Sequence, residues 1–129
     1  MKIAQFYDED RIGLGLIEAD SLIPIDFSGD MIDFIGSGNL NGYGRKGPIP
    51  LDRVSFAPPV SRPSKIVALG LNYKDHAEES KGKVPETPLI FAKFPSSLTG
   101  HMNQITWDRT VTKKVDFEAE LAVIIGQTV

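Results

Sequence analysis

The sequence predicts a mainly β fold with short helices, of the α+β class, built in two parts. Three short strand-like segments open the chain, a proline-rich stretch interrupts it near the middle, and longer apolar segments follow. These features predict a small β-rich domain over residues 1–55, a linker over 56–65 and a second domain whose N-terminal portion is 66–129.

The first part is expected to contain strands at residues 2–7, 11–18 and 21–27, separated by the turns "DED" and "AD". A short helix should follow, with Asp30 as its N-cap and Gly36 as its stop. Residues 36–50 are rich in glycine and predict a loop. The glycines of "GLGL" and "GSG" lack the spacing and the strand-to-helix context of a phosphate loop, so we assign them no ligand.

Composition narrows the class of protein. The 129 residues are 41% hydrophobic and 24% charged, which is typical of a soluble globular protein. A net charge of -3 without a basic stripe argues against nucleic acid as the partner. No apolar run approaches the roughly 18 residues of a membrane span, and the acids of "MKIAQFYDED" favour a cytoplasmic location over a signal peptide. Without cysteine there is no disulfide and no thiolate site.

The second part is expected to begin with a buried strand, because "KIVALGL" is a continuous apolar run with β-branched residues. A helix should follow over residues 71–82, with Asn72 as N-cap and Gly82 as stop. On that helix His76 and Glu79 are three residues apart and share a face. The pair has two interpretations: a carboxylate-oriented imidazole acting as general base, or an ion pair in water.

Lys93 ends the next predicted strand, "PLIFAKF", where it could contact an anionic substrate or extend to solvent. Ser96 and Ser97 have no base at a meaningful spacing, so a serine-nucleophile triad has little support. His101 lies in the loop "GHMNQ" and is expected at the surface.

Glu118 and Glu120 lie one residue apart in the apolar run "KVDFEAELAVII", which predicts a third strand. Alternation along a strand puts both glutamates on one face, with the apolar face from Phe117 to Ile125 turned to the core. Neighbouring like charges repel. Either water solvates this face, or a hard divalent cation with oxygen ligands cancels the repulsion.

The ordered motifs "KIVALGLNYKDHAEE", "PLIFAKFPSSLTG" and "KVDFEAELAVIIG" resemble the fumarylacetoacetate hydrolase superfamily over residues 61–129. Residues 1–55 resemble the small β-rich domain that precedes the catalytic domain in bacterial members. The resemblance implies a mixed β-roll catalytic domain. It also implies Mg²⁺ or Mn²⁺, with Ca²⁺ as a further candidate, bound by Glu118 and Glu120. It further implies a water-activating dyad of His76 and Glu79, and a substrate-binding role for Lys93.

By the same resemblance, the substrate is a 2-oxo or β-dicarbonyl acid, and the reaction is C–C hydrolysis, decarboxylation or isomerisation, with hydrolysis favoured. The complete enzyme is expected to be a homodimer. The family's third metal ligand is an aspartate from a motif beyond residue 129, so the chain is expected to be truncated within the catalytic domain. Phe94 stands where a second proline is common. The alternative is a catalytically inactive module that serves binding or assembly with a second chain.

Overall fold

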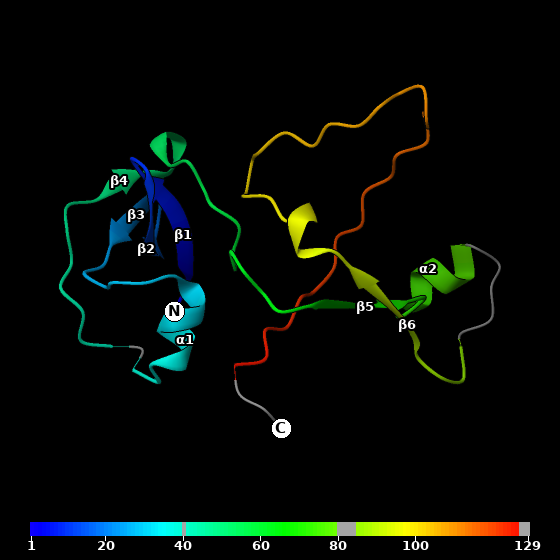
Figure 1. The fold of residues 1–129 in the computed structure, drawn as a ribbon, viewed down its shortest axis with the longest axis horizontal. Coiled ribbons are helices and arrows are strands. Elements are labelled where there is room, and N and C mark those ends of the chain that lie inside the picture. The colour runs from blue at the N-terminus through cyan, green and yellow to red at the C-terminus, as the bar shows by residue number, and fades with distance from the viewer. Residues whose placement is uncertain (40, 80–84, 127–129) are drawn as a thin grey trace. The chain divides into compact units, whose positions relative to one another are not determined.

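The computed structural model describes residues 1–39, 41–79 and 85–126 of the chain. It contains two compact units (Figure 1): the first is Met1–Ser61 with Thr99–Val129, and the second is Arg62–Leu98. The chain is mainly β with short helices, as the sequence predicts. The predicted stop at Gly82, Leu40 of the predicted loop and residues 127–129 lie outside the described residues.

The first unit is built on a four-stranded antiparallel sheet in the order β1-β2-β3-β4 (Figure 1). The strands are β1 (Ile3–Asp8), β2 (Arg11–Glu18), β3 (Ser21–Pro24) and β4 (Ile49–Pro50). The three opening strands are therefore confirmed, with the third ending earlier than expected. The short β4 lies in the segment predicted as loop, where two residues are too few to give a period-two pattern.

The core of this unit lies between one face of the sheet and the helix α1 (Met31–Gly36). Leu14, Ile25, Met31, Phe34 and Val60 are buried together, and Phe34 is only 2% exposed. Phe27 and Tyr43 pack against this cluster, and the Phe27 ring is edge-on to both Phe34 and Tyr43, with 5.3 Å between centroids in each pair. Burial of side chains of this size stabilises a fold by roughly 1.5–3 kcal/mol each.

The start of α1 is fixed by a reciprocal cap, of which the sequence predicts the Asp30 half. Asp30 accepts hydrogen bonds from the backbone N–H groups of Ile32 and Asp33, at 2.9 and 3.1 Å. The Asp33 carboxylate in turn accepts from the backbone N–H of Asp30 at 3.0 Å. These bonds satisfy donors that a helix start otherwise leaves unpaired. The helix ends at Gly36, with Ser37 as its C-cap.

Gln5 is a polar side chain that is 1% exposed within this unit. Its Oε1 accepts a hydrogen bond from the Met31 N–H at 2.6 Å, and its Nε2 donates to the Ser61 hydroxyl at 2.7 Å and to the Pro58 carbonyl. One side chain thus joins β1, the first turn of α1 and the proline-rich stretch. The sequence pattern does not reveal it, because Gln5 occupies a strand position where an exposed residue is also acceptable.

The second unit contains a two-stranded antiparallel sheet of β5 (Ile66–Gly70) and β6 (Leu89–Lys93), with α2 (Lys74–Glu79). Both strands are confirmed, but the expected burial of the first is wrong. Val67 is 58% and Leu69 42% exposed, and every residue of β6 is exposed. Two strands form one layer, and in the described part of the unit no second layer covers its faces.

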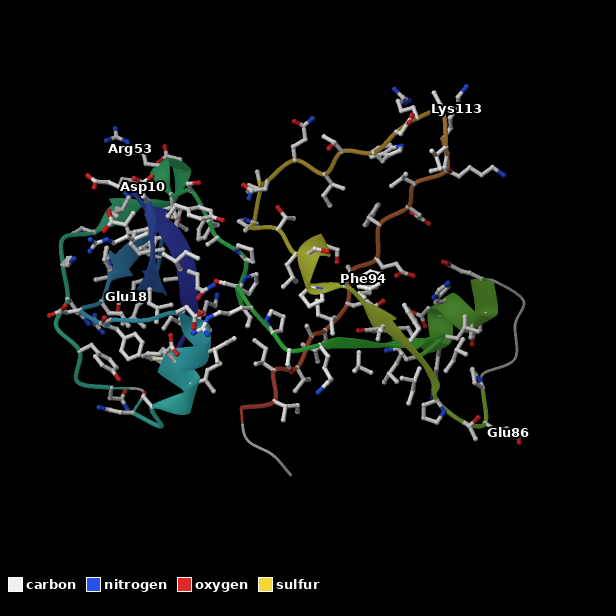
Figure 2. All side chains as sticks on the ribbon, viewed as in Figure 1. Asp10, Glu18, Arg53, Glu86, Phe94 and Lys113 are labelled. Carbon is white, nitrogen blue, oxygen red and sulfur yellow. The ribbon has the colours of Figure 1, made fainter. Side chains whose placement is uncertain are left out.

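Residues 104–126 do not form the third strand that "KVDFEAELAVII" predicts. Phe117 is 88% and Leu121 83% exposed, so the face expected in the core is in solvent. Figure 2 labels Lys113 on this segment, whose backbone is irregular. A strand is stabilised by backbone hydrogen bonds to a neighbouring strand, and none of the described strands pairs with this segment.

Neither helix in the described ranges has the length and apolar character needed to cross a bilayer. The division of the chain at residues 55 and 65 stays a prediction.

Candidate functional site

The scaffold of the candidate site in the second unit is a strand, a tight turn and a helix. β5 ends at Gly70, three turn residues follow, and α2 begins at Lys74. Asn72 therefore precedes the N-cap position by one residue, because the turn itself takes up residues 71–73. Asp75 lies in the first turn of α2, as predicted. Ala77 is the buried residue of this helix, and its N–H donates to the Tyr73 carbonyl at 3.2 Å.

His76 and Glu79 both lie on α2 with exposed side chains. Their spacing of three residues places them on neighbouring parts of the helix surface, as expected. Within the described residues the structure records no hydrogen bond between the two side chains. An imidazole and a carboxylate so placed can meet through a rotamer change, and hydrogen bonds between catalytic groups are often long before a substrate binds.

Lys93 is the last residue of β6 and is exposed. It pairs with Ile66 across the hairpin, at the end of the sheet opposite the turn into α2. The neighbouring Ser97 belongs to a 3-10 turn, Pro95–Ser97, and its hydroxyl donates to the Phe94 carbonyl at 2.8 Å. The Ser97 hydroxyl therefore donates its proton to a nearby backbone carbonyl and not to a catalytic base. This is consistent with the sequence, which gives little support for a serine nucleophile. Phe94 is 80% exposed beside it (Figure 2).

Glu118 and Glu120 lie on the irregular segment of the first unit, and both are exposed. Because the segment is not a strand, alternation does not place them on a common face. In the ranges that the structure describes, no three His, Asp or Glu side chains converge on a point that could hold a metal ion. The two carboxylates fit Mg²⁺ or Mn²⁺ in donor type, because these ions prefer oxygen ligands, but two ligands leave most positions to water or other groups.

Asp108 lies on the same irregular segment, and its carboxyl group has a lowered pKa. The Thr110 hydroxyl donates to it at 2.7 Å and the Thr110 N–H at 2.8 Å, and these hydrogen bonds lower the pKa of Asp108 below its ordinary value. The carboxylate is thus held in its charged form by its own turn. His101, on the surface as predicted, packs edge-on against Phe56 with ring centroids 5.4 Å apart.

Gly70 and Leu71, between β5 and α2, were not singled out from the sequence. A Cβ at Gly70 would lie 2.9 Å from Cδ2 of Leu89, its cross-strand partner, and Leu71 has a φ of 51°. The available signal was a glycine at the end of an apolar strand just before a helix start. No residue pattern in a single sequence predicts a left-handed backbone at a leucine.

Comparison with protein families matches residues 65–129 to the family described as Fumarylacetoacetate (FAA) hydrolase C-terminal. The matched range contains all five candidate residues: His76, Glu79, Lys93, Glu118 and Glu120.

Among individual proteins, the chain is similar to the mitochondrial oxaloacetate tautomerase Fahd2a of Rattus norvegicus, with 46% identity over 79 residues. That alignment covers 61% of this chain and 25% of the relative. The oxaloacetate tautomerase YisK of Bacillus subtilis is 42% identical over 81 residues, which cover 60% of this chain and 27% of that protein. An uncharacterized protein of Archaeoglobus fulgidus is 48% identical over 79 residues, 61% of this chain and 31% of its own length. The aligned part of the chain spans about a quarter of the length of the oxaloacetate tautomerases named above.

Proposed function

The chain belongs to the fumarylacetoacetate hydrolase family, and from this premise we propose that it forms part of an enzyme that isomerises a 2-oxo acid of the oxaloacetate kind. The observation that carries the proposal is the identity of 42–46% to proteins named oxaloacetate tautomerases from a mammal and a bacterium. We therefore place keto–enol isomerisation ahead of the C–C hydrolysis that the sequence motifs favoured.

Isomerisation of a 2-oxo acid moves one proton between a carbon and the oxygen of the adjacent carbonyl. A neutral imidazole suits this task, because it can take a proton on one ring nitrogen and return it near neutral pH. In our proposal His76 transfers the proton and Glu79 orients the ring and stabilises its charged form. Both side chains are exposed on α2 and are therefore accessible to a substrate.

Lys93 supplies a positive charge at the end of β6 that would attract a substrate carboxylate. Glu118 and Glu120 would hold the metal ion, which when bound polarises the oxygens of the keto acid as a Lewis acid. The metal, the homodimer and the cytoplasmic location stay predictions.

The test is the rate of keto–enol interconversion of oxaloacetate by the full gene product, followed by ultraviolet absorbance with Mg²⁺ or Mn²⁺ present. His76→Ala should lower kcat by roughly 10²- to 10⁴-fold, which is typical of losing a general acid–base group. His101→Ala is the matched control, because this histidine is also exposed but packs on Phe56 in the other unit. Glu79→Gln should be slow as well, whereas Glu78→Gln, on the same helix and also exposed, should not.

Calorimetric titration with Mg²⁺ or Mn²⁺ tests the metal separately. Glu118→Gln and Glu120→Gln keep the shape of the side chain and remove its charge, so either should weaken binding, with Glu86→Gln as a control at another exposed glutamate. Equal rates in His76→Ala and the wild type would exclude the proposed dyad. Absence of turnover by the wild type with either metal would favour the inactive binding or assembly module.

A further inference from the structure

Leu71 has a backbone conformation that L-amino acids with large side chains rarely adopt. Its φ is 51°, in the left-handed region, where residues other than glycine are uncommon and asparagine and aspartate are the usual exceptions. Such residues are kept only where the surrounding structure requires them, and they gather at sites where geometry matters. Leu71 lies directly between β5 and α2.

Gly70, one residue earlier, would be the natural place for a left-handed turn, yet its φ lies outside that region. Gly70 is needed for a different reason. A Cβ there would lie 2.9 Å from Cδ2 of Leu89 and 3.6 Å from Cε1 of Phe91, so the missing side chain makes room for the cross-strand packing of β6. Gly70 thus allows β5 and β6 to pack closely, and the positive φ occurs at the next residue, Leu71.

In the part of the chain that the structure describes, the helix α2 buries little of its own surface. α2 has six residues, and among them Ala77 is buried while the others are exposed. A single buried methyl group contributes little to holding a helix in one direction. The path of the backbone through residues 71–73 therefore decides where the α2 side chains point relative to the hairpin.

We propose that Leu71 is a positioning residue: its left-handed backbone sets the direction in which α2 leaves β5 and thereby holds His76 and Glu79 relative to Lys93 on β6. The catalytic meaning of that placement rests on the function proposed above. The geometric part concerns only the second unit and can be tested without turnover.

Two substitutions separate backbone from side chain. Leu71→Val puts a β-branched residue where φ is positive, which should drive the turn out of the left-handed region. Leu71→Asn removes the apolar side chain but tolerates that region. We expect Leu71→Val to lower kcat by about 10- to 100-fold, as misplacement of catalytic groups does, with KM nearly unchanged. Leu71→Asn should stay within about 3-fold of wild type, since an asparagine still permits the orientation on which the rate depends.

Ala19 provides the matched control. It also has a positive φ, 49°, in the exposed turn between β2 and β3 of the other unit. Ala19→Val should lower the urea midpoint of unfolding, as Leu71→Val does, but leave kcat unchanged. A wild-type kcat in Leu71→Val, or an equal loss of kcat in Leu71→Asn, would overturn the proposal, because the backbone angle would then not matter.

Residual dipolar couplings of the full chain give the readout that does not depend on activity. The α2 amide couplings, measured relative to those of β5, should change in Leu71→Val and match wild type in Leu71→Asn. If Leu71→Val does not fold, Leu71→Gly takes its place: the turn then samples both signs of φ, and the α2 couplings should shrink. Unchanged α2 couplings in the folded variant overturn the positioning role. Changed couplings in a protein without turnover support it and reject only the proposed function.

Discussion

Gly15 shows how single residues shape the sheet of the first unit. It lies on the face of β2 opposite Leu14, and a Cβ there would overlap Cδ2 of Leu22 and lie 3.2 Å from the backbone oxygen of Ile23. Leu22 is fully buried, so its side chain packs against neighbours on all sides. The glycines of "GLGL" therefore have a packing reason: Gly13 likewise lies under the Phe6 ring, whose Cε1 would be 2.9 Å from a Cβ.

We expect Gly15→Ala to lower the free energy of unfolding by about 1–3 kcal/mol, the usual cost of overpacking. Gly47→Ala is the control, because nothing lies within 4 Å of a Cβ at that exposed glycine, and its effect should stay within about 0.5 kcal/mol. Urea unfolding followed by circular dichroism measures both. Equal stability of the two variants would mean that Leu22 can repack.

Asp108 provides a prediction on pH. Because the Thr110 hydroxyl is the largest cause of its lowered pKa, Thr110→Val should raise that pKa, although the Thr110 N–H still holds it below the ordinary value. Thr112→Val is the control, since the Thr112 hydroxyl accepts from the Lys114 N–H and does not reach the carboxylate. The measurement is NMR titration of the Asp108 carboxyl carbon.

The sign of the pH effect follows from that direction. A carboxyl whose pKa is lowered in the folded chain stabilises its turn above the unfolded pKa, and the contribution is lost as the pH falls through the folded pKa. The Asp108–Thr110 turn should therefore be intact near neutral pH and open only in acid. A titration of Asp108 at the ordinary value in the wild type would contradict this reading.

At the scale of elements, Gln5 links three segments that its sequence position does not connect. Removing the amide leaves the buried Met31 N–H without its acceptor and the Ser61 hydroxyl without its donor. Buried polar groups left unpaired cost about 1–3 kcal/mol each. We expect Gln5→Leu to reduce the free energy of unfolding by roughly 2–4 kcal/mol, as the loss of a connected buried network does.

Gln104→Leu is the matched control, because that glutamine is exposed on the irregular segment. Amide hydrogen exchange adds a local readout: the N–H of Met31 should exchange faster in Gln5→Leu than in wild type. A stability change below about 0.5 kcal/mol in Gln5→Leu would show that water replaces the amide at little cost.

Local signals explain which elements could be predicted. The opening strands and α1 carry their own evidence in period-two segments, acidic turns and the Asp30 cap, and the structure confirms them. The segment around Glu118 and Glu120 carries an equally clear strand pattern, yet it is irregular. Alternating apolar residues indicate that a segment would fit into a β-sheet. The segment becomes a strand only if another strand of the fold pairs with it. The same limit hides Leu71, because no local pattern in a single sequence indicates a left-handed backbone at a leucine.

The candidate site could be predicted to the level of residue types and local spacing. His76 and Glu79 do share a helix, and Lys93 does end a strand. Their mutual placement with Glu118 and Glu120 was beyond local reasoning, because the two groups belong to different compact units.

At the scale of the whole molecule, the two units differ in how much they bury. In the first unit, Leu14, Leu22 and Phe34 are at most 2% exposed, and a capped helix covers one face of a four-stranded sheet. In the second unit, the described residues form a single hairpin and a six-residue helix whose buried side chain is Ala77. An isolated two-stranded sheet is marginally stable in water. The first unit should therefore have a higher local stability than the second.

We therefore expect hydrogen exchange of the 129-residue chain to separate the units. Amides of β1, β2 and α1 should be protected at least 10-fold more strongly than those of β5 and β6, because opening the first unit exposes its whole core whereas the hairpin opens alone. Leu14→Ala should accelerate exchange throughout β1, β2 and α1 and leave exchange in β5 and β6 unchanged. Ile90→Ala, at a residue that is already 64% exposed, should leave exchange unchanged in both units. Uniform protection across all six strands would show that the units unfold as one. In that case the exposed apolar side chains of β5 and β6 would have to be covered in solution by contacts beyond those of the described residues, because a bare hairpin cannot match the stability of a packed core.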